Sequence, residues 1–413
     1  MSAGPPYWIG CNGPVEWATS RLNSARAKSP PGGDPFAQES IEYWVGLYGS
    51  PLLIIDAERV REQYRRLAAA LPGVDLHYAL KPLPHFSIIQ ILNQEGACFD
   101  LATSGEVELV RRLRVAPERC IHTHPIKRDA DIRTALDYGV RSFVVDNPDE
   151  VRKFEKFRHQ ANLLIRVAFD SPDAVCDLSR KFGCAPEAVP ELLALAADLR
   201  IDISGLSFHV GSQTGESRAY VTAIEVCLQL MSAAGRLGRE MRILDIGGGF
   251  PVSYQTESMP IEEFCAPICA ALKSLAPGVR IIAEPGRYLC APAAIAVASV
   301  MGRALRNDRW WYYLDDGLYG SYSGQLYDHA KYPVAALSAS GETYPSVLAG
   351  PTCDSIDIID EALVLPKLAL GDLVVGRVMG AYTWACATDF NFFPRATVLA
   401  LDRGRLMVEE HKP

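Results

Sequence analysis

A lysine at the end of an apolar segment is the first residue in this chain whose position suggests chemistry. Lys81 closes the strand-like run at residues 74–81, and Pro82 follows directly. An amine at the mouth of a strand suits enzymes that hold the aldehyde of pyridoxal 5′-phosphate (PLP) as a Schiff base. The alternative is a rim lysine that extends into solvent, and it would be preferred if Lys81 stood alone.

Further polar residues interrupt the strand pattern where other apolar runs end. In a parallel barrel these carboxyl ends share one edge, so the side chains would converge on one mouth. The residues concerned are Asp100, Arg166, His209, Gly247, Gly248, Gly249 and Glu284.

Part of this set could hold a phosphate. Backbone amides of the glycine run at 247–249 can approach a phosphate closely, although a glycine triplet is more often only a turn. Arg287 could clamp the same phosphate, or form a surface ion pair. Ser212 offers a hydroxyl to it, or closes a turn.

The remaining residues could act on the cofactor ring. Glu284 could bond the pyridine nitrogen and keep it protonated, or serve as a helix cap or ion-pair partner. His209 could stack on the ring, although a lone histidine is more often a core residue. Asp100 and Glu106 could orient the imine region, but Glu106 also suits an ordinary helix start.

Alternating elements must position these residues. Strands are expected to begin near residues 74, 97, 119, 140, 162, 203, 242 and 279, with helix-like stretches between them; Asp56, for example, is expected to cap one helix. Eight such units predict a (β/α)8 barrel, with a doubly wound open sheet as the alternative.

The ends of the chain differ from this central part. After residue 290, short β-rich runs divided by Gly and Pro predict a second, mostly antiparallel β domain. The sequence therefore predicts a flexible or loosely docked arm at 1–37, a barrel at 52–289, and a β domain formed by 38–51 and 290–413.

Composition narrows the function. The net charge of −8 and the lack of a basic stripe argue against nucleic-acid binding. Eleven scattered cysteines, with no signal-like segment or membrane-length apolar run, favour a reducing cytoplasm. Cys265 and Cys269 lie four residues apart without a second ligand pair, so no metal site is expected.

The predicted β domain carries a second set of polar residues. Cys353 and Asp354 are adjacent in a turn-rich stretch, Tyr327, Asp328 and His329 form another group, and residues 380–383 follow a β run. Each group alone could consist of ordinary loop residues.

Taken together, these segments resemble the fold-type III PLP-dependent decarboxylases, and most closely the ornithine decarboxylase branch. The resemblance extends from about residue 45 to 402. The matching stretches are residues 78–81, 207–212, 244–251, 284–288, 326–330, 350–354 and 379–383.

The resemblance implies an alanine-racemase-like barrel with a β domain and a head-to-tail homodimer that shares its active sites. Lys81 would be the Schiff-base lysine, Glu284 the partner of the pyridinium nitrogen, and His209 the residue stacked on the ring. Cys353 would protonate Cα after CO2 leaves, and would enter from the partner subunit. The phosphate and ring would also be held by Gly247, Gly248, Gly249, Ser212, Arg287, Tyr382, Asp100 and Arg166, and the substrate by Tyr327, Asp328, Asp354 and Phe390.

The same resemblance would bring Asp354 and Tyr382 from the partner subunit. The two carboxylates, Asp328 and Asp354, favour a substrate with a distal ammonium group. L-Ornithine, converted to putrescine, is the preferred substrate, and lysine differs by one methylene worth only about 1–3 kcal/mol. The alternatives are a modified amino acid of a biosynthetic pathway, a catalytically inactive decarboxylase-like regulator and a racemase, the last disfavoured by Cys353.

Overall fold

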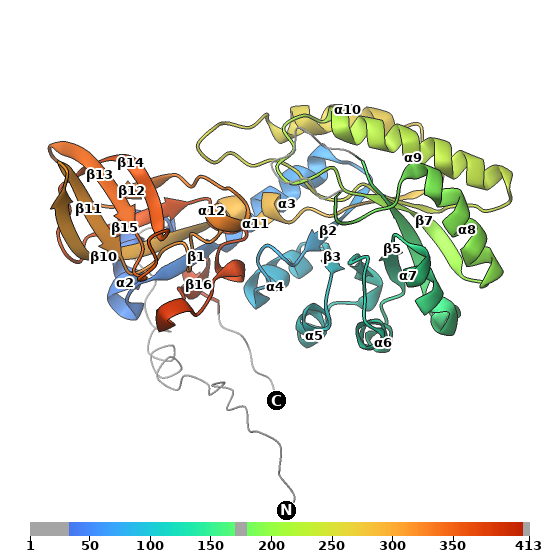
Figure 1. Cartoon of the computed structure of the whole chain (residues 1–413), viewed down its shortest axis with the longest axis horizontal. Helices are drawn as coiled ribbons and strands as arrows, with labels where there is room; N and C mark the ends of the chain where they lie inside the picture. Colours follow the sequence, from blue (N-terminus) through green and yellow to red (C-terminus); the bar gives the residue numbers. More distant parts are fainter. Residues whose placement is uncertain (1–32, 170–179, 408–413) are drawn as a thin grey trace, which may run out of the picture.

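Eight parallel strands form a closed barrel, drawn at the right of Figure 1 in the computed structural model, which describes residues 33–169 and 180–407. The strands pair in chain order, and the last pairs with the first, so no edge stays open. All eight begin within two residues of the predicted positions. They are β2 (Val74–Ala79), β3 (Cys98–Leu101), β4 (Cys120–His122), β5 (Ser142–Val145), β6 (Asn162–Val167), β7 (Asp202–Phe208), β8 (Ile243–Asp245) and β9 (Arg280–Ala283).

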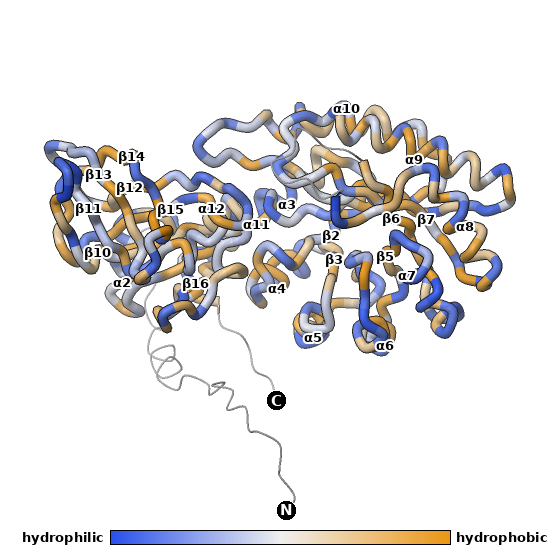
Figure 2. The backbone as a smooth tube through the Cα atoms, viewed as in Figure 1, coloured by the Kyte–Doolittle hydropathy of each residue, from blue (hydrophilic) through white to orange (hydrophobic). Residues whose placement is uncertain are grey.

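The predicted barrel is confirmed, and the open-sheet alternative is wrong, because β2 pairs with both β3 and β9. Helices surround the strands, and in Figure 2 they carry both hydrophobic and hydrophilic stretches, as expected of helices with one face on the barrel. They are α3 (Ala57–Ala70), α4 (Phe86–Gln94), α5 (Ser104–Arg112), α6 (Asp129–Tyr138), α7 (Pro148–Lys153), α8 (Val189–Asp198), α9 (Arg218–Arg236), α10 (Ile261–Leu272) and the short α11 (Arg287–Cys290).

Local sequence explains where the helices begin. Asp56 caps α3 by accepting a hydrogen bond from the Glu58 amide at 2.9 Å, as expected. Asn147 caps α7 in the same way through the Glu150 amide at 3.0 Å, with Pro148 in the first turn. These caps mark the residues at which α3 and α7 begin.

A mostly antiparallel sheet forms the second domain, at the left of Figure 1. Two pairs are parallel, β1 with β16 and β11 with β13. The elements are α2 (Gln38–Tyr48), β1 (Leu52–Asp56), β10 (Ala294–Arg306), β11 (Arg309–Leu314), α12 (Gly324–Tyr327), β12 (Val334–Ala336), β13 (Thr343–Ala349), β14 (Ile358–Pro366), β15 (Leu373–Arg377), β16 (Thr397–Asp402) and β17 (Arg405–Leu406).

The predicted start of the barrel at residue 52 is wrong. Residues 52–56 were assigned to the barrel, but β1 pairs with β10 and β16 in the second sheet. All five residues of β1 are buried, and the apolar run at 52–55 could not indicate which sheet would bury it.

The segment before β1 packs on the same sheet. Trp44 of α2 is buried with Leu52 and Ile54 in a cluster that also contains Phe36. Residues 1–32 of the predicted arm lie outside the described residues. Among the described residues, no helix is both long and apolar enough to cross a membrane.

Candidate active site

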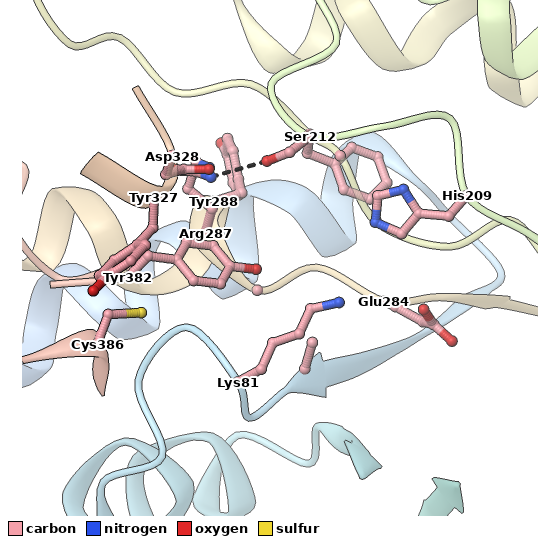
Figure 3. A pocket seen from close by; sticks show the side chains of 15 residues that line it. Lys81, His209, Ser212, Glu284, Arg287, Tyr288, Tyr327, Asp328, Tyr382 and Cys386 are labelled. Carbon is pink, nitrogen blue, oxygen red and sulfur yellow. Dashed lines mark hydrogen bonds and ion pairs between the residues drawn. The ribbon is translucent and has the colours of Figure 1, made fainter. Parts of the chain in front are cut away.

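A cavity of about 280 Å³ opens at the carboxyl ends of the barrel strands, where the β domain meets the barrel (Figure 3). It brings together residues from segments that are more than 300 positions apart in the chain, from Ala79 to Cys386. The lining residues are Ala79, Lys81, His209, Ser212, Gly248, Gly249, Phe250, Glu284, Gly286, Arg287, Tyr288, Tyr327, Asp328, Tyr382 and Cys386.

Lys81 follows β2 and extends into this cavity (Figure 3). Burial lowers the pKa of its ammonium group, but Tyr382, Asp100 and Glu284 outweigh that effect, so the pKa lies above its usual value. The arrangement therefore places an amine among acidic partners at the base of the cavity.

Glu284 follows β9 and carries an unpartnered oxygen. It is 8% exposed, and its Oε1 has no hydrogen-bond partner in the structure. Burial, and then the neighbouring carboxyl of Asp245, raises the pKa of Glu284 well above its usual value. A buried carboxyl oxygen of this kind can accept a hydrogen bond from a cationic or proton-donating group of a ligand.

The glycine run supplies a close backbone surface beside Glu284. Gly247 and Gly249 have φ of 67° and 116°, a region that favours glycine. A Cβ on Gly248 would lie 2.5 Å from the carbonyl oxygen of Glu284, so a side chain cannot be accommodated there. The run therefore leaves its backbone accessible to a ligand.

Arg287, the first residue of α11, lines the same cavity as Gly248 and Gly249. Its guanidinium donates to the Ser212 hydroxyl at 2.9 Å and to the Tyr254 hydroxyl at 2.8 Å, and it forms an ion pair with Asp328 at 2.5 Å. It also lies over the Tyr382 ring, 4.9 Å from the centroid. Its Nε is buried without a partner.

The other predicted residues surround Lys81. His209 accepts a hydrogen bond at Nδ1 from the Gly211 amide at 3.0 Å, and burial holds its pKa well below the usual value, so the imidazole is neutral. Arg166 and Asp100 do not line the cavity, but both act electrostatically on Lys81.

Two acidic groups behind the cavity have strongly raised pKa values. Burial, with the charge of Glu284, raises the pKa of Asp100 to about 8, and its carboxyl accepts a hydrogen bond from Thr123. Burial raises the pKa of Glu106 to about 7, and Glu106 accepts from the Ala102 amide at 2.5 Å. Glu106 therefore belongs to the first turn of α5, as at an ordinary helix start.

These features fit PLP. The unpartnered Oε1 of Glu284 suits a protonated pyridine nitrogen, and the glycine run with Ser212 and Arg287 suits a phosphate. Lys81 lies between them, where an aldehyde would be held.

A family model described as "Pyridoxal-dependent decarboxylase, pyridoxal binding domain" matches residues 57–291. The chain belongs to the pyridoxal-dependent decarboxylases. This decarboxylase is 36% identical over 354 residues to the lysine/ornithine decarboxylase of Selenomonas ruminantium. The aligned residues cover 86% of this chain and 90% of the relative. It is also 36% identical over 364 residues to antizyme inhibitor 2 of Xenopus laevis, with 84% and 79% of the two chains covered.

Solved structures agree with this family. The decarboxylase is 53% identical to the lysine/ornithine decarboxylase of Vibrio vulnificus complexed with putrescine, with a TM-score of 0.85 and coverage of 89% and 98%. A second structure of that protein is complexed with cadaverine and has a TM-score of 0.84, 54% identity and coverage of 87% and 97%. The protein is therefore an alanine-racemase-like, PLP-dependent carboxy-lyase that acts on basic amino acids, as the sequence predicted.

Three residues predicted for the active site, Cys353, Asp354 and Phe390, lie outside the cavity of their own chain. Cys353 is exposed, and its amide donates to the Asn391 side chain at 3.0 Å. Asp354 accepts a hydrogen bond from the Tyr319 hydroxyl, and the Tyr319 ring stacks on Phe390 with centroids 4.5 Å apart. None of these five residues lines the cavity. We call Tyr319, Cys353, Asp354, Phe390 and Asn391 the Cys353 cluster.

The predicted position of Tyr382 is wrong. It was expected to enter from a partner subunit relative to Lys81, but it lines the same cavity as Lys81 within one chain. The amide of Tyr382 donates to the Pro82 carbonyl at 3.0 Å, which ties this loop of the β domain to the segment after Lys81. Only the packing of the two domains could reveal that contact.

Sequence reasoning missed three residues of the site. Asp245 lies beside Glu284, and burial raises its own pKa to about 6. Tyr254 contacts Arg287, and Cys386 lines the cavity. Asp245 ends β8 two residues before Gly247, which is a usable signal. Tyr254 lies in a loop and Cys386 ends the short 3-10 helix Trp384–Cys386, and neither stands in a recognisable pattern.

Cys265 and Cys269 both lie in α10. Cys265 is buried in the core, and the Cys269 thiol donates to the Ala70 carbonyl at 3.2 Å. Within residues 33–169 and 180–407, no group of three or more His, Cys, Asp or Glu residues could hold a metal ion.

Proposed function

We propose that the enzyme decarboxylates L-ornithine to putrescine and also accepts L-lysine. The observation that carries this proposal is the Asp328 carboxylate in the cavity that contains Lys81. A distal ammonium group in such a cavity needs a carboxylate partner. The similarity to a lysine/ornithine decarboxylase with bound putrescine or cadaverine supports the same substrate class.

In this proposal the barrel holds the cofactor. Lys81 provides the amine for its aldehyde, Glu284 accepts from the pyridine nitrogen, and His209 covers the ring. The phosphate is held by Gly247, Gly248, Gly249, Ser212, Arg287 and Tyr382, while Asp100 and Arg166 lie beside the ring. When bound, PLP supplies a protonated ring that accepts the electrons left when CO2 departs.

The side chains of this protein then orient the substrate. Asp328 and Asp354 bind the distal ammonium, and Tyr327 and Phe390 flank the substrate's carbon chain. Ornithine and lysine differ by one methylene, and a single methylene gives only about 10- to 200-fold discrimination. Both substrates are therefore compatible with one pair of carboxylates.

We infer that Cys353 and Asp354 act in the active site of a second subunit. Both lie in the Cys353 cluster outside the cavity of their own chain, and Cys353 is exposed. A head-to-tail homodimer with twofold symmetry would bring each Cys353 cluster to the partner's Lys81. Cys353 then donates a proton to the substrate Cα.

A panel of amino acids tests the reaction. Purified holoenzyme is incubated with L-ornithine, L-lysine, L-arginine and meso-diaminopimelate, and CO2 and the amine product are measured, the latter by mass. We expect putrescine and cadaverine as products. Turnover of arginine or diaminopimelate alone, or of none of the four, would refute the proposed substrates.

Subunit mixing tests the shared site. Lys81→Ala and Cys353→Ala variants are each expected to be inactive, whereas a refolded or exchanged mixture should recover about a quarter of the wild-type activity, because half of the dimers carry one intact site. A mixture as inactive as its components would show that Lys81 and Cys353 act within one chain.

The similarity to antizyme inhibitor 2 raises a second candidate, a regulator without catalysis. Retention of Lys81, Glu284, Arg287 and Cys353 favours the enzyme instead. We also infer a reducing, cytoplasmic environment, since all nine cysteines in the described part of the chain are free.

A further inference from the structure

The ion pair between Arg287 and Asp328 joins two groups that the proposed function assigns to different ligands. The Arg287 side chain is 5% exposed and that of Asp328 12%, with 2.5 Å between Nη1 and Oδ2. Arg287 begins α11 at the end of the barrel, whereas Asp328 follows α12 in the β domain. The cation assigned to the cofactor phosphate therefore contacts the carboxylate assigned to the substrate.

The two terminal nitrogens of the guanidinium contact groups on the phosphate side and on the substrate side. Nη2 donates to Ser212 at 2.9 Å, on the side of the predicted phosphate site, and Figure 3 shows this contact. Nη1 contacts Asp328 and the Tyr254 hydroxyl. A phosphate next to Ser212 would consequently share one guanidinium with Asp328.

Sharing has an electrostatic consequence. A phosphate and a carboxylate on a single arginine leave excess negative charge in a largely buried site, where charges are poorly screened. An ammonium group next to Asp328 would neutralise this excess. Phosphate and ammonium should then favour each other's binding, a reciprocal coupling between two sites.

We propose that Asp328 competes with the cofactor phosphate for Arg287, and that a cation bound to Asp328 relieves this competition and tightens the hold on the cofactor. This inference rests on the proposed function for the identity of that cation, the distal ammonium of the substrate or product. Asp328 would thus link occupancy of the substrate position to retention of PLP.

The test measures the rate at which holoenzyme loses its cofactor. Wild type and Asp328→Asn are freed of excess PLP, and the visible absorbance of the protein-bound cofactor is followed during continuous dialysis. Each is measured without amine, with 1-butylamine and with putrescine. Both amines can react with the aldehyde, but only putrescine brings a second ammonium group.

Two results are expected. Without amine, Asp328→Asn should lose PLP roughly tenfold more slowly than wild type, a coupling within the common range. In wild type, putrescine should slow the loss roughly tenfold more than 1-butylamine, whereas in Asp328→Asn the two amines should act alike.

Two further variants separate competition from a simple structural bridge between domains. Tyr254→Phe removes an uncharged contact of Arg287, and should preserve the wild-type difference between putrescine and 1-butylamine. Asp402→Asn breaks a different carboxylate–arginine pair, Asp402 with Arg61 at 2.8 Å, outside the site, and should match wild type in all three conditions.

Faster cofactor loss from Asp328→Asn than from wild type, without amine, would overturn the proposal, because Asp328 would then support Arg287. So would an undiminished putrescine effect in that variant. The amine-free comparison is independent of the substrate: slower loss from Asp328→Asn in an enzyme that turns over no basic amino acid would support the competition and refute the proposed function.

Discussion

The cavity at the barrel mouth and the Cys353 cluster differ in how far one chain alone encloses their functional residues. The cavity collects Lys81, Glu284 and Arg287 within one chain, with Glu284 and Arg287 buried. The Cys353 cluster is partly open to solvent, and Cys353 itself is exposed and does not line the cavity. One region is preorganised by the fold, whereas the other presents reactive groups outward.

This difference suggests a division between two tasks, cofactor binding and action on the substrate. Cofactor binding needs buried, fixed charges, which one barrel can supply. Cys353, Asp354 and Phe390, which are proposed to act on the substrate, lie on a surface that a second chain can complete. The predictions below test whether cofactor binding and turnover separate along this line.

The largest effect is expected at Lys81. Lys81→Ala should reduce decarboxylation to below detection and abolish the visible absorbance of the aldehyde-bound cofactor, because no other amine lines the cavity. Lys81→Arg keeps the positive charge but should fail equally. Activity retained by Lys81→Arg would mean that charge, and not the amine, is required. Turnover assays and absorbance spectra provide the measurements.

Cys353→Ala should separate the two regions. Loss of a general acid should lower kcat by about 10²- to 10⁴-fold, while the cofactor absorbance stays unchanged. Cys386→Ala is the matched control, since Cys386 is the thiol that lines the cavity of its own chain. If Cys386→Ala loses turnover and Cys353→Ala does not, the proton donor lies within one chain and the comparison fails.

Asp354→Asn should have a smaller effect on turnover of basic substrates. Loss of a charge-assisted contact to the distal ammonium should lower kcat/KM for ornithine and lysine by about 10- to 100-fold. Tyr319→Phe, which removes only the hydroxyl that contacts Asp354, should lower kcat/KM by less. Unlike Asp328→Asn, Asp354→Asn should leave cofactor loss at the wild-type rate; a changed rate would contradict the separation of the two regions.

The smallest effect concerns pH and stability. The pKa of Asp100 is about 8 in the folded chain against an ordinary 3.8, so between these values the folded state holds a proton that the unfolded chain has released. The cofactor-free protein should lose stability as pH rises from 5 to 8, and Asp100→Asn should weaken this trend by on the order of 1 kcal/mol.

Urea unfolding at pH 5 and pH 8 measures this effect. Asp131→Asn is the control: its ion pair with Arg128 lowers the pKa of Asp131, so its contribution is constant between pH 5 and 8 and is lost only at lower pH. Equal pH trends for wild type and Asp100→Asn would show that Asp100 does not carry the proton.

The barrel was predictable because its signals are local. Most of its strands are apolar runs with a polar residue at or near the carboxyl end, and α3, α4, α5 and α7 each begin at a side-chain cap, such as Asp56 before α3. The last pairing, β2 with β9, follows from the count of eight units. β1 was misassigned because a fully buried strand looks the same in either sheet.

The site was predictable to the extent that it lies at strand ends. Lys81, His209 and Glu284 follow β2, β7 and β9, so a barrel brings them to one edge. Tyr382 and Cys386 come from a β-domain loop, and their place depends on how the two domains pack.

The sequence by itself determined the barrel, the residues at its mouth and the family, because strand period, polar strand ends and ordered motifs are written along the chain. Tertiary structure alone decided which loops of the β domain face Lys81, and that Arg287 pairs with Asp328. The physical reason is that such contacts join segments about 40 to 300 residues apart, and side-chain packing, not local pattern, sets their distances.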